Sequence, residues 1–420
     1  MGYVPRLRSL WGPAGRKDGA EWSLVSPVSV AVVCLHTDPF APPGSGDVGG
    51  MNVVVRHTSQ ALAARGHRIE VITRRSDPDS PEVCVVDGVR VRRVSAGPPH
   101  PVPKGEHEGF IAPFRERLED LEPVDVVHSH HWFSGMAALP VAHAWGVPHV
   151  QSFHSIAAPP LTALAEGERP ESPGRLAGEA HLARRSDAVV AVSDAEATTA
   201  ITRLGAPASR MWVVHPGVDP RVFHPLAEPL PAGGRPRVLL AARLEPLKGV
   251  DLAIRALARL PQPRPILQVA GGATHGTEYV DSLQALAAQL GVVEDVALLG
   301  PQSREELARL MREASIVLVP SHSETYGLVA LEAAASGVPV VAGAVGGLRE
   351  AVRDGVTGLL LPDREPRTWA EALARVLDSE DLRARMSQAS RAHARERGWD
   401  TTAGGMLAAY CALLQESRTA

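Results

Sequence analysis

The pattern that most constrains the fold is an alternation of short apolar runs with longer segments of helical periodicity. Strands that alternate with helices in this way are typical of a parallel sheet covered by helices on both faces. The first half of the chain predicts strands at 28–35, 69–73, 124–128, 148–153 and 187–193, with helices at 52–66, 134–145 and 174–185 among them.

A proline- and glycine-rich stretch without periodicity, residues 226–236, interrupts this pattern and is typical of a linker. The alternation then restarts at residue 237 and continues to residue 361. We therefore expect an α/β protein with two Rossmann-like, doubly wound domains, 28–225 and 237–398, that face each other across a cleft. Residues 1–27 are expected to form a loose extension, and residues 399–420 to close the chain as a helix.

Charge and cysteine usage exclude several classes of protein. Lys and Arg number 43 against 47 Asp and Glu, and a net charge of −4 gives no general attraction to nucleic acid or anionic lipid. Cys34, Cys84 and Cys411 are widely spaced, which argues against a disulfide framework and against a cysteine-based zinc site. No apolar run approaches the roughly 18 residues that span a bilayer. We expect a cytoplasmic protein without integral membrane contact.

Three motifs suggest other chemistry, and each has a simpler interpretation. Residues 44–49 match GxGxxG, with Arg74 and Arg75 available for the 2′-phosphate of NADP. Seven residues with three prolines, 37–43, separate this loop from the preceding strand, so a reductase is disfavoured. Asp77-Pro78-Asp79 is a DxD pattern, but the serines and proline around it favour an exposed turn.

A histidine group is the third such motif. His128, His130 and His131 with His154 suggest a metal cluster. Strand alternation, however, places His128 and His130 on one face and His131 on the other, and neither a carboxylate nor a cysteine lies nearby in sequence to complete a tetrahedral site. A metal site here is therefore disfavoured.

The second half carries more specific signals. Glu324 and Glu332 have E-x7-E spacing, and the backbone N–H groups of Gly327 and Leu328 at a helix start can bind a phosphate. Arg243 and Lys248 follow the first strand of the second domain, where two cations can bracket a diphosphate. Each motif alone is also compatible with solvated surface charges. Together they indicate a nucleotide site.

These motifs in combination resemble glycosyltransferase family 4, whose members have the GT-B fold, and the resemblance runs from about Val28 to the carboxyl end. The motifs are the R-x4-K of Arg243 and Lys248, the E-x7-E, Gly346-Gly347-Leu348 and residues 355–360. The amino-terminal half is most similar to the family members that join N-acetylglucosamine to inositol phosphate in mycothiol biosynthesis. The shared stretches are 36–39, 46–52, 128–132 and 154–158.

The resemblance implies a role for each matching residue. Catalysis would involve His154, Arg243, Lys248 and Glu324. Donor binding would involve Gly50, Arg243, Lys248, Glu324, Thr325, Tyr326, Gly327, Leu328 and Glu332. Acceptor binding would involve Asn52, Lys104, His131, Ser155 and Arg175. The closing helix would cross back to the first domain.

The implied activity is transfer of a sugar from a UDP-sugar, with UDP-N-acetylglucosamine expected, to a small polar acceptor such as inositol phosphate. Attack on the face that the diphosphate leaves would retain configuration, and no metal or other cofactor would be required. One alternative is a family 4 transferase of a specialised-metabolite pathway with an aminocyclitol acceptor and a different nucleotide sugar. Another is a catalytically silent binding protein, and the sequence leaves a homodimer open.

Departures from the family pattern concern the acceptor most. His131 stands where the inositol phosphate transferases have tyrosine, and Ser155 stands where they have threonine. Both positions help to hold the acceptor phosphate in those relatives. Arg349 replaces the usual proline after Gly-Gly-Leu and adds a cation near the donor cleft.

Overall fold

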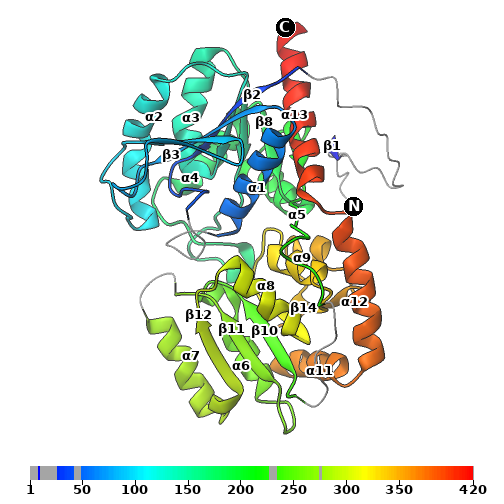
Figure 1. The fold of residues 1–420 in the computed structure, drawn as a ribbon. Coiled ribbons are helices and arrows are strands. Elements are labelled where there is room, and N and C mark those ends of the chain that lie inside the picture. The colour runs from blue at the N-terminus through cyan, green and yellow to red at the C-terminus, as the bar shows by residue number, and fades with distance from the viewer. Residues whose placement is uncertain (1–7, 10–25, 42–48, 227–233, 274–276, 420) are drawn as a thin grey trace.

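The computed structural model describes residues 8–9, 26–41, 49–226, 234–273 and 277–419. These form two α/β units, one above the other in Figure 1, and a long C-terminal helix that runs up beside the upper unit. The linker predicted at 226–236 and the GxGxxG loop at 44–49 lie largely outside the described residues.

The first unit contains a mostly parallel sheet with strand order β1-β9-β8-β7-β6-β2-β3-β5-β4. Its strands are β1 (Arg8–Ser9), β2 (Ser29–Cys34), β3 (Arg68–Arg74), β4 (Val83–Val86), β5 (Val89–Val94), β6 (Val126–His130), β7 (His149–Ser152), β8 (Ala188–Ala191) and β9 (Met211–Val213). Its α-helices are α1 (Gly50–Ala64), α2 (Ile111–Glu119), α3 (Trp132–Trp145), α4 (Arg175–Arg185) and α5 (Asp194–Thr199). All five strands that the sequence predicts in this half are present.

Three features of this sheet differ from the sequence-based expectation, and the first is strand β9, which lies outside every predicted strand. The hairpin of β4 and β5, which is antiparallel, was not predicted. Arg8 and Ser9, expected to be loose, pair in parallel with Trp212 and Val213 of β9. The physical reason is that an edge strand such as β9 presents unpaired N–H and C=O groups, which favour an added strand.

The second unit contains a parallel sheet with order β12-β11-β10-β13-β14-β15, which is the doubly wound order 3-2-1-4-5-6 when its strands are counted from β10. The strands are β10 (Arg237–Ala241), β11 (Ile266–Ala270), β12 (Val296–Gly300), β13 (Ile316–Val319), β14 (Val340–Gly343) and β15 (Gly358–Leu361). The helices are α6 (Val250–Leu257), α7 (Glu278–Gln289), α8 (Arg304–Glu313), α9 (Leu328–Ala335), α10 (Leu348–Ala351), α11 (Pro366–Leu377) and α12 (Glu380–Arg395).

Strand order determines where ligands bind in each unit. The order reverses between β10 and β13 in the second sheet and between β2 and β6 in the first. In open α/β sheets, ligands bind beyond the carboxyl ends of the strands at this switch point. Arg243 follows β10, Glu324 follows β13, and His131 follows β6, so the predicted residues lie at these edges.

The last helix, α13 (Trp399–Thr419), follows the second unit but packs against the first. Met406, Leu407 and Tyr410 of α13 belong to the same buried apolar cluster as Val30 and Val32 of β2. This helix therefore covers one face of the first sheet and joins the two units a second time.

Direct hydrogen bonds also connect the units. The Ser193 hydroxyl donates to the Thr325 carbonyl at 2.7 Å. The Glu350 carboxylate lies 2.9 Å from His215 Nε2 and accepts hydrogen bonds from the backbone N–H groups of Asp194 and Ala195 at 3.0 and 3.2 Å. These contacts bring the end of β8 beside the loop after β13.

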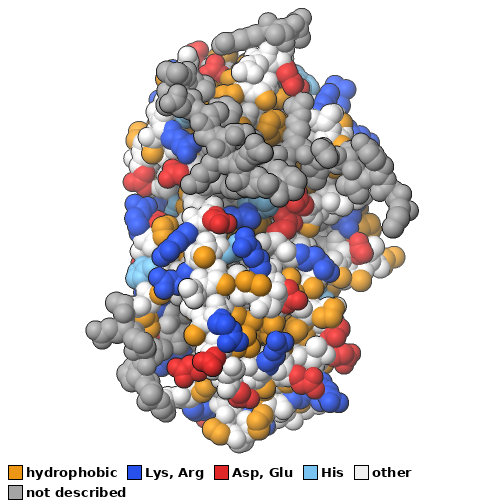
Figure 2. Space-filling model, turned by 90° about the vertical axis from the view of Figure 1, so that its right-hand side faces the viewer, with side chains coloured by type: hydrophobic (Ala, Val, Ile, Leu, Met, Phe, Trp, Pro, Cys, Tyr) orange, Lys and Arg blue, Asp and Glu red, His pale blue; other side chains and the backbone are white. Residues whose placement is uncertain are grey.

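The surface agrees with the balanced composition. On the face in Figure 2, acidic and basic side chains are interspersed over the second unit and form no extended patch of one sign. Among the helices of the described residues, none combines the length and the apolar character that crossing a membrane requires.

Candidate active site

Lys248 and Glu324 meet at the switch point of the second sheet. Lys248 ends a short 3-10 helix after β10, and its Nζ lies 2.9 Å from Glu324 Oε2. Gly249 follows with a φ of +67°, and a Cβ there would lie 2.2 Å from the Pro320 carbonyl oxygen. Glycine is therefore required where this loop packs against the end of β13. This packing brings the Lys248 ammonium group into contact with the Glu324 carboxylate.

Arg243 lies between the two units. Its guanidinium is 3.2 Å from Glu245 Oε1, and its side chain is 37% exposed. The charge of Arg243 also acts on the first unit, because it helps to lower the pKa of Glu168. The charge of Arg243 thus acts on groups of both units.

The Gly-Gly-Leu motif supports the loop that begins at Glu324. The Gly347 N–H donates to the Glu324 carbonyl at 3.0 Å. Gly346 has a φ of +46°, and a Cβ on Gly346 or Gly347 would lie 2.0 Å from Glu324 O or 2.2 Å from Thr325 O. Any larger residue would displace this loop, so the motif fixes the backbone that precedes α9.

The loop leads into α9, which carries Glu332. Glu332 is 5% exposed, its Oε1 lies 3.1 Å from Arg304 Nη2, and burial raises its pKa although Arg304 opposes the shift. Gly327, with a φ of +95°, precedes the first residue of α9. Tyr326 is buried without a hydrogen-bond partner for its hydroxyl, and burial raises its pKa to about 12.

Gly50 and Asn52, predicted on the first unit, open α1. A Cβ on Gly50 would lie 3.3 Å from Leu328 Cδ1, so the starts of α1 and α9 approach each other across the two units. Asn52 is 2% exposed and bonds to its own loop, donating to Thr37 Oγ1 and the Asp38 carbonyl and accepting from the Gly49 N–H. Its amide therefore organises the loop in this structure, and direct contact with an acceptor remains a prediction.

The predicted acceptor residues Lys104, Ser155 and Arg175 lie together. Arg175 is fully buried, and its guanidinium donates to Ser155 Oγ at 2.9 Å and pairs with Glu168 at 3.4 Å. Lys104 Nζ lies 3.3 Å from the same Glu168. Arg175 also pairs with Glu171 and, at 2.8 Å, with Glu179.

The charge of Glu168 is set by these partners. Burial alone raises the pKa of a carboxyl group, but Lys104, Arg175 and Arg243 together lower the pKa of Glu168 well below its usual range. Burial alone would lower the pKa of Arg175, but the nearby carboxylates of Glu168, Glu179 and Glu171 have the larger effect and raise it. Both cations predicted to bind an acceptor phosphate are thus already paired.

The His131 side chain lies beside this cluster, and its ring forms no hydrogen bond. It is 3% exposed, neither ring nitrogen has a partner, and Nε2 is 3.8 Å from Glu171 Oε1. Its φ of +68° turns the chain between β6 and α3, and its ring lies 4.4 Å from that of His36. Burial lowers the pKa of His131 well below its usual value, so it is uncharged at neutral pH.

His154 follows β7 with a φ of +62°. Its Nε2 forms a 2.7 Å hydrogen bond with His130 Nδ1, and burial lowers its pKa to about 4. A neutral imidazole at the carboxyl edge of the sheet can exchange hydrogen bonds with a sugar without adding charge.

Sequence reasoning missed four residues at this site: His36, His130, Glu168 and Glu171. The acidic run of Glu166, Glu168 and Glu171 just before α4 was a usable signal, because carboxylates near buried arginines tend to pair with them. His36 and His130 lie in the stretches shared with the inositol phosphate transferases, but the resemblance alone gives neither residue a role.

The DxD pattern and the histidine group, which suggested other chemistry, form a turn and a set of packed rings. Asp77 accepts hydrogen bonds from the Asp79 N–H at 3.0 Å and the Ser80 hydroxyl at 2.7 Å, which confirms the exposed turn. His128 and His130 lie on one face with ring centroids 4.2 Å apart, as strand alternation predicts. Within the part of the chain that the structure describes, no three His, Cys, Asp or Glu side chains are grouped to hold a metal ion.

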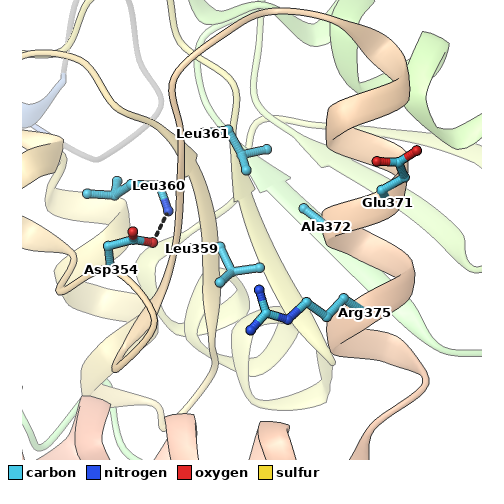
Figure 3. A pocket seen from close by; sticks show the side chains of 7 residues that line it. All are labelled: Asp354, Leu359, Leu360, Leu361, Glu371, Ala372 and Arg375. Carbon is cyan, nitrogen blue, oxygen red and sulfur yellow. Dashed lines mark hydrogen bonds between the residues drawn. The ribbon is translucent and has the colours of Figure 1, made fainter.

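A pocket of about 320 Å³ lies elsewhere, between β15 and α11 of the second unit. Figure 3 shows Leu359 and Leu361 facing Ala372 and Arg375 there, while Asp354 accepts a hydrogen bond from the Leu360 N–H at 2.9 Å. None of the predicted site residues lines it.

Comparison with known proteins agrees with this geometry. Residues 226–393 match the family described as Glycosyl transferases group 1, and residues 49–217 match the Glycosyl transferase 4-like domain. The D-inositol 3-phosphate glycosyltransferase of Mycolicibacterium smegmatis is 41% identical over 408 residues, 94% of this chain and 93% of that protein. The Mycobacterium avium protein of the same name is 43% identical over 414 residues, 94% and 96% of the two chains.

A solved structure extends the comparison to the fold. The sucrose-phosphate synthase of Thermosynechococcus elongatus aligns with a TM-score of 0.84 and 27% identity, covering 93% of this chain and 100% of that chain. Two doubly wound sheets with the paired cation and carboxylate at a switch point define a glycosyltransferase of the GT-B fold. The chain belongs to glycosyltransferase family 4, as the sequence motifs predict, and the inositol 3-phosphate glycosyltransferases are among its relatives.

Proposed function

We propose that this glycosyltransferase moves N-acetylglucosamine from UDP-N-acetylglucosamine to an inositol phosphate, with retention of configuration and without a metal ion. The observation that carries the proposal is the 2.9 Å pair of Lys248 and Glu324 beside Arg243 at the switch point of the second sheet. Relatives about 40% identical over nearly their whole length carry the name D-inositol 3-phosphate glycosyltransferase, which supports the acceptor.

The second unit would hold the donor. Arg243 and Lys248 neutralise the diphosphate, and the backbone from Thr325 to Leu328 at the start of α9 binds its phosphate oxygens. Glu324 binds the donor sugar, and Glu332 accepts hydrogen bonds from the ribose hydroxyls after exchanging part of its contact with Arg304. Gly50, where a Cβ would lie 3.3 Å from Leu328 Cδ1, lets the backbone at the start of α1 approach the donor at the start of α9.

Transfer would occur on the face from which the diphosphate departs. An acceptor hydroxyl oxygen bonds to the anomeric carbon, the bond from that carbon to the diphosphate oxygen breaks, and the leaving phosphate takes the hydroxyl proton. Arg243 and Lys248 stabilise the negative charge that develops on the leaving group, which is the role a divalent cation has in other transferases. Neutral His154 orients the donor sugar by hydrogen bonding.

The first unit would hold the acceptor. Lys104, Ser155 and Arg175 would bind the phosphate, and His131 would supply the hydrogen bond that a tyrosine gives in the inositol phosphate transferases. For this, Lys104 must exchange part of its 3.3 Å contact with Glu168 for the phosphate.

One observation favours a second acceptor class. Glu168 and Glu171 already pair with the cations of this cluster, while His36 and His131 are neutral. This carboxylate-rich cluster suits an amine-bearing cyclitol, whose ammonium group would pair with Glu168.

The two acceptors are distinguished by one competition assay. The purified enzyme is given UDP-N-acetylglucosamine with equal amounts of myo-inositol 1-phosphate, free myo-inositol and a diaminocyclitol, and products are separated by mass spectrometry. We expect one N-acetylhexosamine residue to be added mainly to the phosphorylated cyclitol. A product on the diaminocyclitol alone would establish the second class, and no product from any of the three would refute both.

A further inference from the structure

His154 is the end of a chain of buried polar side chains that begins on the C-terminal helix. The Tyr410 hydroxyl of α13 lies 2.7 Å from His128 Nδ1. The His128 ring lies against that of His130, with centroids 4.2 Å apart, and His130 Nδ1 is 2.7 Å from His154 Nε2. Tyr410, His128 and His130 are at most 3% exposed, whereas His154 is partly exposed.

Hydrogen bonding fixes the protonation of the inner part of this chain. The Ser152 hydroxyl donates its one proton to the Val190 carbonyl at 2.8 Å, so it can only accept from His128 Nε2 at 3.0 Å. Burial lowers the pKa of His128, which is therefore neutral and carries its proton on Nε2. His128 Nδ1 must then accept a hydrogen bond from the Tyr410 hydroxyl. The His128 ring, against which the His130 ring lies, therefore has one fixed orientation.

The backbone of His154 is held as well. Its φ of +62° is uncommon for a residue with a side chain. The Glu196 carboxylate, which accepts the Val192 N–H at 2.7 Å, faces the His154 backbone N–H. Neither the backbone nor the ring of His154 is thus free to turn without breaking a buried contact.

We propose that His130 is a positioning residue for sugar transfer: it engages Nε2 of His154, so that Nδ1 is the ring nitrogen presented to the donor sugar. The inference rests on the proposed function, in which His154 contacts that sugar. A 2.7 Å hydrogen bond from the buried His130 ring to the partly exposed His154 ring keeps His154 in one rotamer. A misplacement of about 1 Å at a reacting centre costs about 10²-fold in rate.

Two substitutions separate positioning from packing. His130→Phe keeps a planar ring against His128 but removes both nitrogens, whereas His130→Asn keeps a polar atom close to the Nδ1 position. We expect His130→Phe to lower kcat about 10- to 100-fold with UDP affinity within twofold of wild type, and His130→Asn to recover most of the loss. Equal activity of the two variants, or a change confined to KM, would overturn the proposal.

A double-mutant cycle tests whether His130 acts through His154. We expect His130→Phe combined with His154→Ala to be as slow as His154→Ala alone, because the second change removes the group that His130 orients. Multiplicative losses would overturn the inference while the proposed function stands. An inactive wild-type enzyme, or a fully active His154→Ala, would overturn the proposed role of His154 and this inference with it. If circular dichroism shows that His130→Phe is unfolded, His130→Leu replaces it in both experiments.

Discussion

Replacing Lys248 by methionine should slow sugar transfer about 10²-fold without unfolding the protein. The change keeps most of the side-chain length and removes the ammonium group that lies 2.9 Å from Glu324. Because the Lys248 side chain is 16% exposed and its loop is held by Gly249, the fold should survive.

The magnitude follows from the charge that develops on the leaving diphosphate. At about 4 Å and an effective dielectric constant of about 20, a unit charge pair is worth about 4 kcal/mol. Partial charge development and the contact with Glu324 reduce this to about 3 kcal/mol. At about 1.4 kcal/mol for each factor of ten, the loss in kcat is about 10²-fold.

The assay is UDP release at saturating donor and acceptor, with thermal unfolding recorded for each variant. Arg255→Met is the matched control, since Arg255 is an exposed cation on α6, shortly after the same loop. We expect the control to retain wild-type kcat. If Lys248→Met stays within threefold of wild type while the donor is shown to bind, the charge of Lys248 has no part in departure of the diphosphate, and the reasoning is refuted.

Further predictions concern the metal, the nucleotide, the acceptor and pH. EDTA should leave transfer intact, and a requirement for manganese would contradict this prediction. Glu332→Ala should weaken UDP binding by about 1 to 3 kcal/mol, measured by calorimetry, because charged hydrogen bonds to the ribose are lost. Unchanged UDP binding would contradict the role of Glu332. Lys104→Ala should raise the KM for a phosphorylated acceptor and leave that for the donor unchanged, whereas an equal rise in both would argue against an acceptor site. Burial lowers the pKa of His149 to about 3 and of His154 to about 4. Below pH 6.5 the unfolded chain therefore binds more protons than the folded protein does. Each of the two histidines should lower the free energy of unfolding by about 2 kcal/mol as pH falls from 7.5 to 5. Burial raises the pKa of Glu196 to about 7, so its ionisation lowers stability as pH rises from 4.5 through 7. Glu196→Gln should therefore gain about 2.5 kcal/mol of unfolding free energy relative to wild type between pH 5 and 8, measured by urea unfolding.

The fold was predictable because its signals are local. Apolar runs and helical periodicity determine strands such as β7, which spans 149–152 inside the predicted range 148–153. The β4–β5 hairpin lies outside the predicted strands, although Asp87-Gly88 between its strands is a recognised sequence signal for a hairpin turn and has the positive φ angles of one. The parallel pairing of Arg8 and Ser9 with β9 could not be predicted, since two residues carry no periodicity.

The site was predictable only where motif and geometry coincide. The sequence predicts that Lys248 and Glu324 follow strands that meet at one switch point, but it does not show that the two side chains form an ion pair. The pairing of Glu168 with both Lys104 and Arg175 depends on three segments that meet through the tertiary fold. The hydrogen bond of His130 to His154 likewise joins residues 24 positions apart, on neighbouring strand ends.

The most direct test of the central claim is the anomeric configuration of the product formed without added metal. The EDTA-treated enzyme is incubated with UDP-N-acetylglucosamine labelled with carbon-13 at the anomeric carbon and with myo-inositol 1-phosphate, and the labelled carbon is followed by NMR. We expect the α-linked donor signal to be replaced by that of an α-linked N-acetylglucosaminyl inositol phosphate. A β-linked product, release of free sugar alone, or an unchanged donor would contradict the account.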